Sequence, residues 1–568
     1  MASIVTAPAD LRPANLARMM QLESYDYVIV CTGDAKQAEY WQRRLTRMNG
    51  QVFLGSKVLA VDESAWNGGA GNGFGTLFAF ENACKKCQEL YGEDLTARLR
   101  EGASVSLYHT AGKGTRLAPL PGSEVNNKPG VQLPGVLMQQ EQFNGNGTTY
   151  SYENISILEA VIKQTGVYAT SRGGRLSVYW GDQIFIPSAD ASYIPTHEVD
   201  IMCTLREMPD AATWAAEGLD KYGLIAVNAD GNAAQVEKVS HATATSLLSD
   251  GLGEVASVGT SLGSFSVSVR FLEAIMAEFA PELAKREGSR DTDPHFWMPL
   301  TLSRDSYLSI MAQKGVNADT AATNYDRMAG FRATFEAATG VGSGAAGEGK
   351  EDSCSVRMFG AVDIGRDTFW WDYGQLRLYN KFNKMMCRNN PEAEAMRGFF
   401  GVTPGRVVAS EALTAEGSQV VIDEASCVVA WAGPTPPTQG GRVESSCLSR
   451  VFASQSLDVQ DSLLVGVTAK KISAHGALCY NVVDTTDEGV VLTPGQCRCD
   501  VIIDGARQSL LCDTEHDGRV SWKLKVSGNS MTFEEVWKYN KTQDCVALLL
   551  KARNDHATAI RTMSEAGN

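Results

Sequence analysis

The sequence predicts an α/β protein with a mostly parallel sheet, followed by a β-domain in its last third. Up to about residue 400, short β-rich runs alternate with segments of helical periodicity, which is typical of parallel sheets covered by helices. Glycine-rich turns follow several of these β-rich runs. After about residue 400 the helical periodicity fades, and short Val/Leu/Ser segments recur. The 568 residues are too many for one compact core, so we expect about two to four domains.

Composition and charge are those of an ordinary globular protein, with 44% hydrophobic and 21% charged residues. The net charge of −15 argues against a nucleic-acid partner held by its phosphates, so an anionic substrate would need a local basic pocket. No apolar run approaches the length that crosses a bilayer, and we expect no membrane insertion. The 13 scattered cysteines and an N-terminus without a secretory apolar core predict an intracellular protein, cytoplasmic or in a plastid.

The first hundred residues alternate strand and helix. The run 27–32 predicts a strand, the run 35–45 a helix, and the run 52–62 two further strand-like segments. A glycine-rich loop, Gly68 to Gly75, then opens another helix. Such a loop either binds a ligand or only begins the helix, and the sequence leaves both interpretations open. We expect residues 1–102 to be an N-terminal α/β segment integral to the domain that follows.

The stretch from Tyr108 to Pro134 is the most informative part of the chain. A strand-like run, Val105 to Tyr108, leads into the glycine-rich turn 112–116 and then into the basic pair Lys128-Pro129. Small side chains let backbone N–H groups approach phosphate oxygens, and Arg116 and Lys128 add positive charge there. The turn is neither a Walker loop nor a dinucleotide GxGxxG, because the Gly-Lys-Ser/Thr ending and the third glycine are missing.

The pattern G-x-G-T-R, a variable loop and K-P, directly after a strand, resembles the signature of the sugar-nucleotide pyrophosphorylases, the sugar-1-phosphate nucleotidylyltransferases. The resemblance implies a Rossmann-like (GT-A-like) nucleotidyltransferase domain over residues 103–400, with Arg116 and Lys128 as catalytic residues. It implies nucleotide binding by Ala111, Gly112, Lys113, Gly114, Thr115 and Gly181. The N-terminal order YVIVCTGDAKQAEYWQRRL, then GNGFGTLFAFENA, also resembles the start of fucose-1-phosphate guanylyltransferases.

Two carboxylates are candidate metal ligands. The strand-like run 176–180 ends in Gly-Asp182, and a carboxylate just beyond such a strand lies at the crevice where open α/β sheets bind ligands. Asp372 lies in an aromatic run that resembles the family's W-x-D-x-G. The resemblance implies that Asp182 and Asp372 share one Mg²⁺, with a plain Gly-Asp turn as the alternative for Asp182. The segment Asp293-Pro294-His295 between them predicts a helix start or a turn.

A hairpin is expected around Asp230-Gly231, a two-residue turn between alternating apolar runs. The second run ends in Glu237-Lys238, which resembles the family's E-K-P except that Val239 replaces the proline. The resemblance implies sugar-phosphate binding by Gly223, Glu237, Lys238 and Gly263, although the run SLGSF around Gly263 lacks the family's asparagine. The alternative for Glu237 and Lys238 is a solvated charged pair.

Residues 401–525 carry apolar residues at intervals of six. One row is Val451, Leu457, Leu463 and Ala469, and a second is Ala453, Val459 and Val465. A six-residue period is what a β-helix with three short sides per turn requires, and a plain antiparallel β-domain is the alternative. The pyrophosphorylase family often carries a left-handed β-helix, which favours the first interpretation. We expect the residues of the first row to stack on successive turns, and residues 526–568 to be helical.

Together these features predict an enzyme that uses Mg²⁺ to transfer a nucleotidyl group from a nucleoside triphosphate to a sugar-1-phosphate, in nucleotide-sugar biosynthesis. Pyrophosphate is the second product. UTP and glucose-1-phosphate, giving UDP-glucose, are the first expectation, and the N-terminal resemblance keeps GTP and fucose-1-phosphate open. The alternative of another class is a catalytically silent regulatory or ligand-sensing relative. We also expect self-association through the C-terminal domain.

Overall fold

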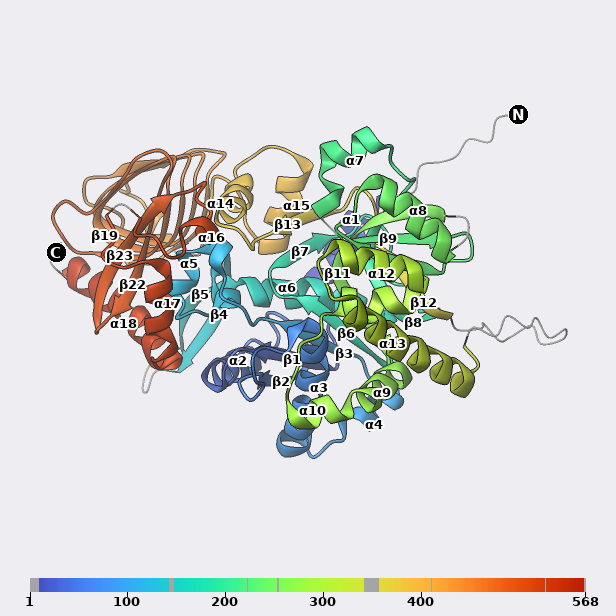
Figure 1. Cartoon of the computed structure of the whole chain (residues 1–568). Coiled ribbons are helices and arrows are strands. Elements are labelled where there is room, and N and C mark those ends of the chain that lie inside the picture. The colour runs from blue at the N-terminus through green and yellow to red at the C-terminus, as the bar shows by residue number, and fades with distance from the viewer. Residues whose placement is uncertain are drawn as a thin grey trace.

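The computed structural model describes residues 10–142, 148–221, 223–252, 255–341, 357–409, 411–526 and 528–565. The protein is mixed α/β, with a nine-stranded sheet and a ten-stranded sheet that are both rich in parallel pairs. The long ribbon of β4 (Gln132–Gln142) and β5 (Thr148–Ser156) lies between these two sheets (Figure 1). None of the helices in the described ranges is long and apolar enough to span a membrane.

The nine-stranded sheet begins with four strands that pair in parallel, in the order β2-β1-β3-β6. These are β1 (Tyr27–Thr32), β2 (Lys57–Asp62), β3 (Val105–His109) and β6 (Arg175–Trp180). Successive residues of β1 face two different cores: Val28 packs with Trp41 of α2 (Ala35–Arg47), and Ile29 packs with Phe78 of α3 (Gly71–Tyr91). Helices α2 and α3 therefore cover opposite faces, which explains why every residue of β1 is buried.

The second half of this sheet is mixed. Strand β11 (Val255–Ser268) runs antiparallel to β6, to β8 (His197–Arg206) and to β9 (Gly223–Asn228). Strand β12 (Arg357–Asp363) pairs in parallel with β8. Strands β9 and β10 (Ala233–Glu237) form the predicted hairpin, and Gly231 in its turn has a φ of 81°.

The remaining helices that precede the ten-stranded sheet in the chain are short, apart from α13. They are α1 (Arg12–Met20), α4 (Leu95–Arg100), α5 (Leu120–Ser123), α6 (Ile157–Thr165), α7 (Ala211–Glu217), α8 (His241–Leu252), α9 (Val269–Glu278), α10 (Ala280–Lys285), α11 (Met298–Thr301), α12 (Arg304–Gln313), α13 (Ala318–Thr339), α14 (Leu376–Met385) and α15 (Pro391–Phe400). The strands predicted at 27–32 and 176–180 are confirmed, but the run 52–62 holds only one strand, because Phe53 forms just an isolated bridge with Asn49.

The glycine-rich loop before α3 is occupied by the protein itself. The backbone N–H of Gly73 donates to the carbonyl of Arg290 (2.8 Å), and that of Asn72 donates to Oδ1 of Asp291 (3.0 Å). Gly71 has a φ of 70°, and a Cβ at this position would press against the carbonyl of Arg290. The first amides of the helix are therefore satisfied within the chain, which favours the helix-start interpretation.

The ten-stranded sheet is a stack of parallel strands in which only the last pair, β22–β23, is antiparallel. Its strands are β14 (Val407–Ala409), β15 (Val420–Ile422), β16 (Cys427–Trp431), β17 (Gly441–Glu444), β18 (Cys447–Gln460), β19 (Leu463–His475), β20 (Leu478–Asp484), β21 (Val490–Leu492), β22 (Gln496–Ile503) and β23 (Ala506–Asp513). The antiparallel alternative is therefore wrong for most of this region.

The stacking row predicted from the six-residue period is also wrong. Val451 pairs with Val467, and Leu457 pairs with Ile472, so stacked residues are separated by a full turn rather than by one hexad. Leu457 lies in the apolar cluster inside the stack, whereas Leu463 belongs to the core shared with the first sheet. The period of six identifies buried positions along the chain. Which of these residues pair on neighbouring strands depends on the number of residues in one full coil of the stack.

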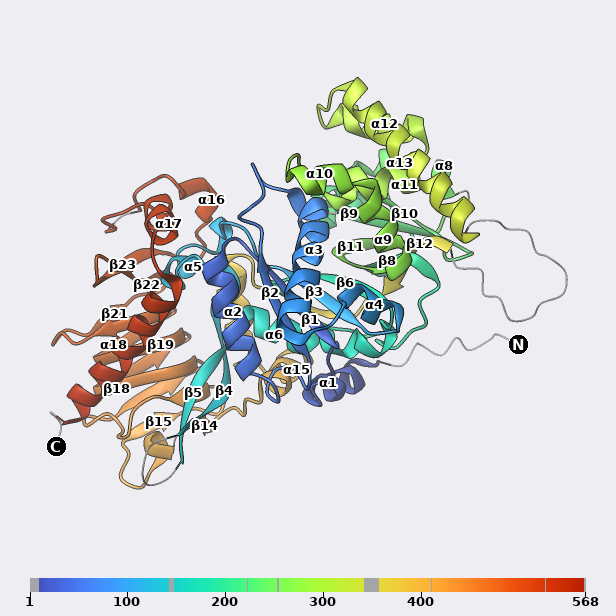
Figure 2. The same ribbon diagram turned by 90° about the horizontal axis from the view of Figure 1, so that it is seen from below.

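The C-terminal helices connect the two halves. They are α16 (Gly518–Ser521), α17 (Phe533–Lys541) and α18 (Cys545–Glu565), and α18 begins near α2 and runs along the parallel stack (Figure 2). His556 of α18 is buried between the hydroxyl of Thr468 (2.9 Å) and the side-chain oxygen of Asn481 (2.9 Å). These two contacts hold helix α18 against strands β19 and β20.

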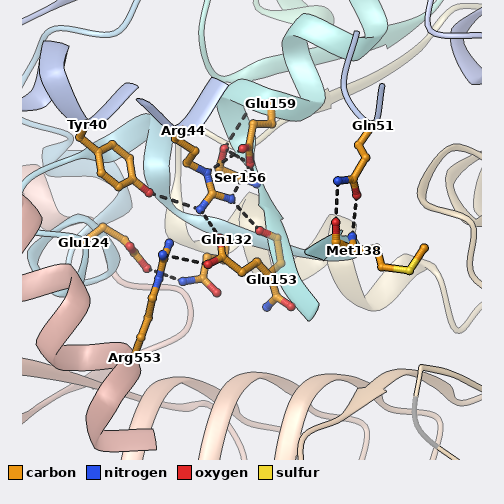
Figure 3. A network of polar contacts seen from close by, with 11 residues as sticks. Tyr40, Arg44, Gln51, Glu124, Gln132, Met138, Glu153, Ser156, Glu159 and Arg553 are labelled. Atoms are coloured by element: carbon orange, nitrogen blue, oxygen red, sulfur yellow. Dashed lines mark hydrogen bonds and ion pairs between the residues drawn. The ribbon is translucent and has the colours of Figure 1, made fainter. Parts of the chain in front are cut away.

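A buried charged network joins α2, β5, α6 and α18 (Figure 3). The guanidinium of Arg44 donates to both carboxylate oxygens of Glu159 (2.6 and 2.8 Å) and to Glu153 (2.8 Å). The other oxygen of Glu153 pairs with Arg553 of α18 at 2.8 Å. Two cations and two carboxylates thus balance one another between the two halves of the molecule.

Candidate functional site

A cavity of about 410 Å³ opens at the carboxyl ends of β3 and β6. Because these strands pair in parallel, the loops that follow them emerge at the same edge of the sheet. We call it the first cavity. Of the residues predicted for the site, those that line it are Ala111, Arg116, Lys128, Gly181, Asp182, Gly223, Lys238 and Gly263.

Asp182 and Asp372 come together beside Gly374. The pairing of β7 (Gln183–Ile186) with β13 (Phe369–Asp372) sets Asp372 opposite Gln183, and the N–H of Tyr373 donates to the carbonyl of Asp182 (2.9 Å). A Cβ at Gly374 would lie 2.8 Å from Oδ2 of Asp182 and 3.0 Å from Oδ1 of Asp372. Both carboxylates therefore border the same small space, which only a glycine leaves open.

Charged groups near the two carboxylates act on the pKa of Asp372 in opposite directions. Burial and the negative charge of Asp182 raise the pKa of Asp372, while the Gly374 amide, Arg116 and Lys128 act to lower it. The ammonium group of Lys128 forms an ion pair with Asp182. Burial and the repulsion between the two carboxylates outweigh these cations at Asp372, so a further cation would be stabilised there.

The glycine-rich turn is shaped by its neighbours. Gly114 has a φ of 65°, and a Cβ there would lie 3.1 Å from Pro121 Cγ and 3.3 Å from Lys128 Cβ. This close approach holds Lys128 next to the turn. Gly112 and Lys113 do not line the first cavity, and instead face a second cavity of about 650 Å³ on the other side of the turn.

The segment after the turn rests on the C-terminal helices. Gly518 of α16 approaches the carbonyl of Thr115 so closely that a Cβ would overlap it. The side chain of Asn126 donates to the carbonyl of Trp537 (2.7 Å), and that of Asn540 donates to the carbonyl of Gly122 (2.8 Å). Residues four hundred positions downstream therefore position the turn, a dependence that no local pattern indicates.

The far end of the first cavity holds the residues predicted for the sugar phosphate. Gly263 has a φ of 73° in a bulge of β11, and a Cβ there would overlap the indole nitrogen of Trp180. Gly223 and Lys238 come from the hairpin β9–β10. The backbone of Glu237 pairs with Gly223, while its side chain lies outside the part that the structure describes.

Several residues of the first cavity were not predicted as site residues. They are His109, Thr110, Pro129, Trp180, Gln183, Ser261, Leu262 and Asp293. Asp293 begins the short helix Asp293–Trp297, so the predicted helix start is confirmed and also reaches the cavity. Burial lowers the pKa of His109 to about 4, and its Nε2 lies 2.8 Å from the hydroxyl of Thr76. His109 and Trp180 are the last residues of β3 and β6, and this position at a strand end is the sequence feature that could have identified them as site residues.

In the described ranges, no three His, Cys, Asp or Glu side chains are grouped so that they could hold a metal ion. The two carboxylates beside Gly374 are a sparser arrangement, of the kind that Mg²⁺ uses together with phosphates and water. No protein-family model matches this chain, and no curated protein matches its sequence.

Proposed function

We propose that this protein is a Mg²⁺-dependent sugar-1-phosphate nucleotidylyltransferase. One observation carries the proposal: Asp182, which lines the first cavity together with Arg116 and Lys128, borders one small space with Asp372. Such a set of two carboxylates and two cations suits the transfer of a phosphoryl-type group, where catalysis consists of positioning and charge neutralisation.

In the proposed reaction, a phosphate oxygen of the sugar-1-phosphate attacks the α-phosphorus of the triphosphate. The new P–O bond forms as the bond to the β-phosphate oxygen breaks, and pyrophosphate leaves. Arg116 would stabilise charge on the departing pyrophosphate through its fixed donor fork. Lys128, now paired with Asp182, would turn to the phosphates. The hairpin residues Gly223 and Lys238 would contact the sugar phosphate.

Asp182 and Asp372 would hold the Mg²⁺, since their oxygens face one space and their mutual repulsion is relieved by a cation. When bound, the ion neutralises phosphate charge and polarises the reacting phosphorus centre. The residues of the chain supply the orientation of both substrates.

The architecture supports this proposal at the level of fold class. The four parallel strands β2, β1, β3 and β6 are compatible with a Rossmann-like nucleotidyltransferase sheet, and the parallel C-terminal stack is compatible with a β-helix. We infer UTP and glucose-1-phosphate as the first substrate pair, with GTP and fucose-1-phosphate as the second. A silent relative is less well supported, because both carboxylates and Arg116 are in place.

Pyrophosphate release tests the proposal directly. The protein is incubated with Mg²⁺, each of the four common nucleoside triphosphates, and a panel of sugar-1-phosphates. We expect release with one pair, loss of release in EDTA, and loss in Asp372→Asn. Asp367→Asn is the matched control, because Asp367 is an exposed aspartate in the same loop region. Full activity in Asp372→Asn, or no release with any pair, would refute the proposal.

A further inference from the structure

The second cavity, of about 650 Å³, lies directly beside the first. Thr110 and Ala111 line both, so the start of the glycine-rich turn is the boundary between them. A cavity of a few hundred Å³ is the usual size for one small ligand. A transferase of the proposed kind must hold two substrates with their phosphates in contact, and two adjoining cavities meet that need.

One wall of the second cavity belongs to the sheet. Gly33 and Asp34 follow β1, and Glu63 and Ser64 follow β2. Because β1 and β2 run parallel to β3, these residues emerge at the same edge as Thr110. The second cavity therefore continues the crevice of the first along the same sheet edge.

The opposite wall comes from the end of the chain. Helix α17 contributes Trp537, Asn540 and Lys541, and Gln543 and Cys545 follow it. The ammonium of Lys113 lies 5.0 Å from the centre of the Trp537 ring, and that of Lys541 lies 4.4 Å from it. The ring of Trp537 is thus approached by two cations, one from the glycine-rich turn and one from the C-terminal helix.

These walls differ in chemistry. Lys36, Lys113 and Lys541 supply positive charge, while Asp34 and Glu63 supply hydrogen-bond acceptors at the strand ends. A ligand with an anionic chain, hydroxyl groups and a flat ring would use all of them. The cations suit phosphates, the carboxylates suit ribose hydroxyls, and the indole face suits a base.

We propose that the nucleoside triphosphate occupies the second cavity, and that helix α17 completes this site through Trp537 and Lys541. This inference rests on the proposed function. The nucleoside lies between the strand ends and Trp537, and the polyphosphate passes Gly112 and Lys113 toward Asp182 in the first cavity. The C-terminal segment is accordingly part of the nucleotide site, and the sugar phosphate stays at the hairpin end of the first cavity.

The test compares Lys541→Gln with Lys538→Gln, which removes an exposed lysine of the same helix that pairs with Glu534 and does not line the cavity. Binding of each nucleoside triphosphate to the full chain is measured by equilibrium dialysis in EDTA, and KM values are measured where turnover occurs. We expect Lys541→Gln to weaken triphosphate binding about tenfold, as the loss of one charged contact does. The KM for the sugar phosphate should not change, and Lys538→Gln should behave as wild type.

A second variant, Trp537→Leu, should weaken binding of the triphosphate and of the corresponding nucleoside monophosphate alike. Equal triphosphate affinity in wild type, Lys541→Gln and a folded Trp537→Leu would overturn the inference, while pyrophosphate release would leave the proposed function standing. If Lys541→Gln and Trp537→Leu lose nucleotide binding but the wild type releases no pyrophosphate, the inference is upheld and the proposed function is refuted. No nucleotide binding to wild type, together with no pyrophosphate release in Mg²⁺, would refute both.

Discussion

Two clusters of charged side chains in this protein differ in how completely they are satisfied. In the network of Arg44, Glu153, Glu159 and Arg553, each guanidinium nitrogen of Arg44 has an oxygen partner, and positive and negative charges are equal in number (Figure 3). Beside the first cavity, Asp182 and Asp372 lie close to Lys128 and Arg116, and burial and the second carboxylate still raise the pKa of Asp372.

This comparison distinguishes a charged cluster that stabilises the fold from one that can bind a ligand. Both clusters are largely removed from water, so burial does not separate them. The network is complete within the chain, because any charge left unpaired there would cost several kcal/mol. The pair beside Gly374 is different, because burial and the neighbouring carboxylate raise the pKa of Asp372 even with Arg116 and Lys128 close by. Incomplete compensation, rather than burial, identifies the site.

The largest effect is expected from breaking the network. Arg44→Leu leaves Glu159 buried without its cation and should lower the free energy of unfolding by about 3–5 kcal/mol. Urea denaturation measures this change. Arg43→Leu is the matched control, because Arg43 is an exposed neighbour paired only with Glu39, and it should cost about 0.5 kcal/mol or less. Equal stabilities of the two variants would contradict the comparison.

The first cavity should respond in the opposite way. Asp372→Asn relieves the repulsion with Asp182 and keeps an oxygen for the Gly374 amide, so stability should be unchanged or slightly higher. The rate of pyrophosphate release should fall at least about a hundredfold, because a charge-neutralising ligand is lost. Denaturation and turnover are measured on the same preparation. A marked loss of stability would mean that Asp372 is structural.

A smaller effect is expected at Arg116. Arg116→Lys keeps the positive charge but removes the planar donor fork. We expect kcat to fall about tenfold and KM for the triphosphate to change less, because the fork acts mainly on the departing pyrophosphate. Steady-state kinetics separate the two constants. An unchanged kcat would indicate that the turn only shapes the loop.

A pH-dependent effect is expected at His109, whose pKa burial lowers from 6.5 to about 4. As pH falls below 6.5 the unfolded chain takes up this proton before the folded protein does, so His109 makes stability fall between about pH 6.5 and pH 4. His109→Gln should lack this contribution and show a flatter stability profile in that window. Denaturation at several pH values measures the difference, and parallel profiles would contradict it.

The features that depend on local pattern could be predicted from the sequence. The strand 27–32, the turn at Asp230-Gly231 and the strand before Asp182 were predicted because side-chain periodicity and turn chemistry act over a few residues. The gathering of Arg116, Lys128 and Asp182 was also predictable, since parallel strands bring their following loops to one edge.

Contacts between residues far apart in the sequence could not be predicted from local pattern and are seen in the folded structure alone. The period of six marked buried positions after residue 450, yet Leu457 stacks on Ile472, because the length of a whole turn sets the pairing. The loop before α3 is filled by Arg290 and Asp291, and the second cavity is closed by Trp537. Each of these outcomes depends on which distant segments pack together in the folded protein, and preferences that act over a few residues do not specify those contacts.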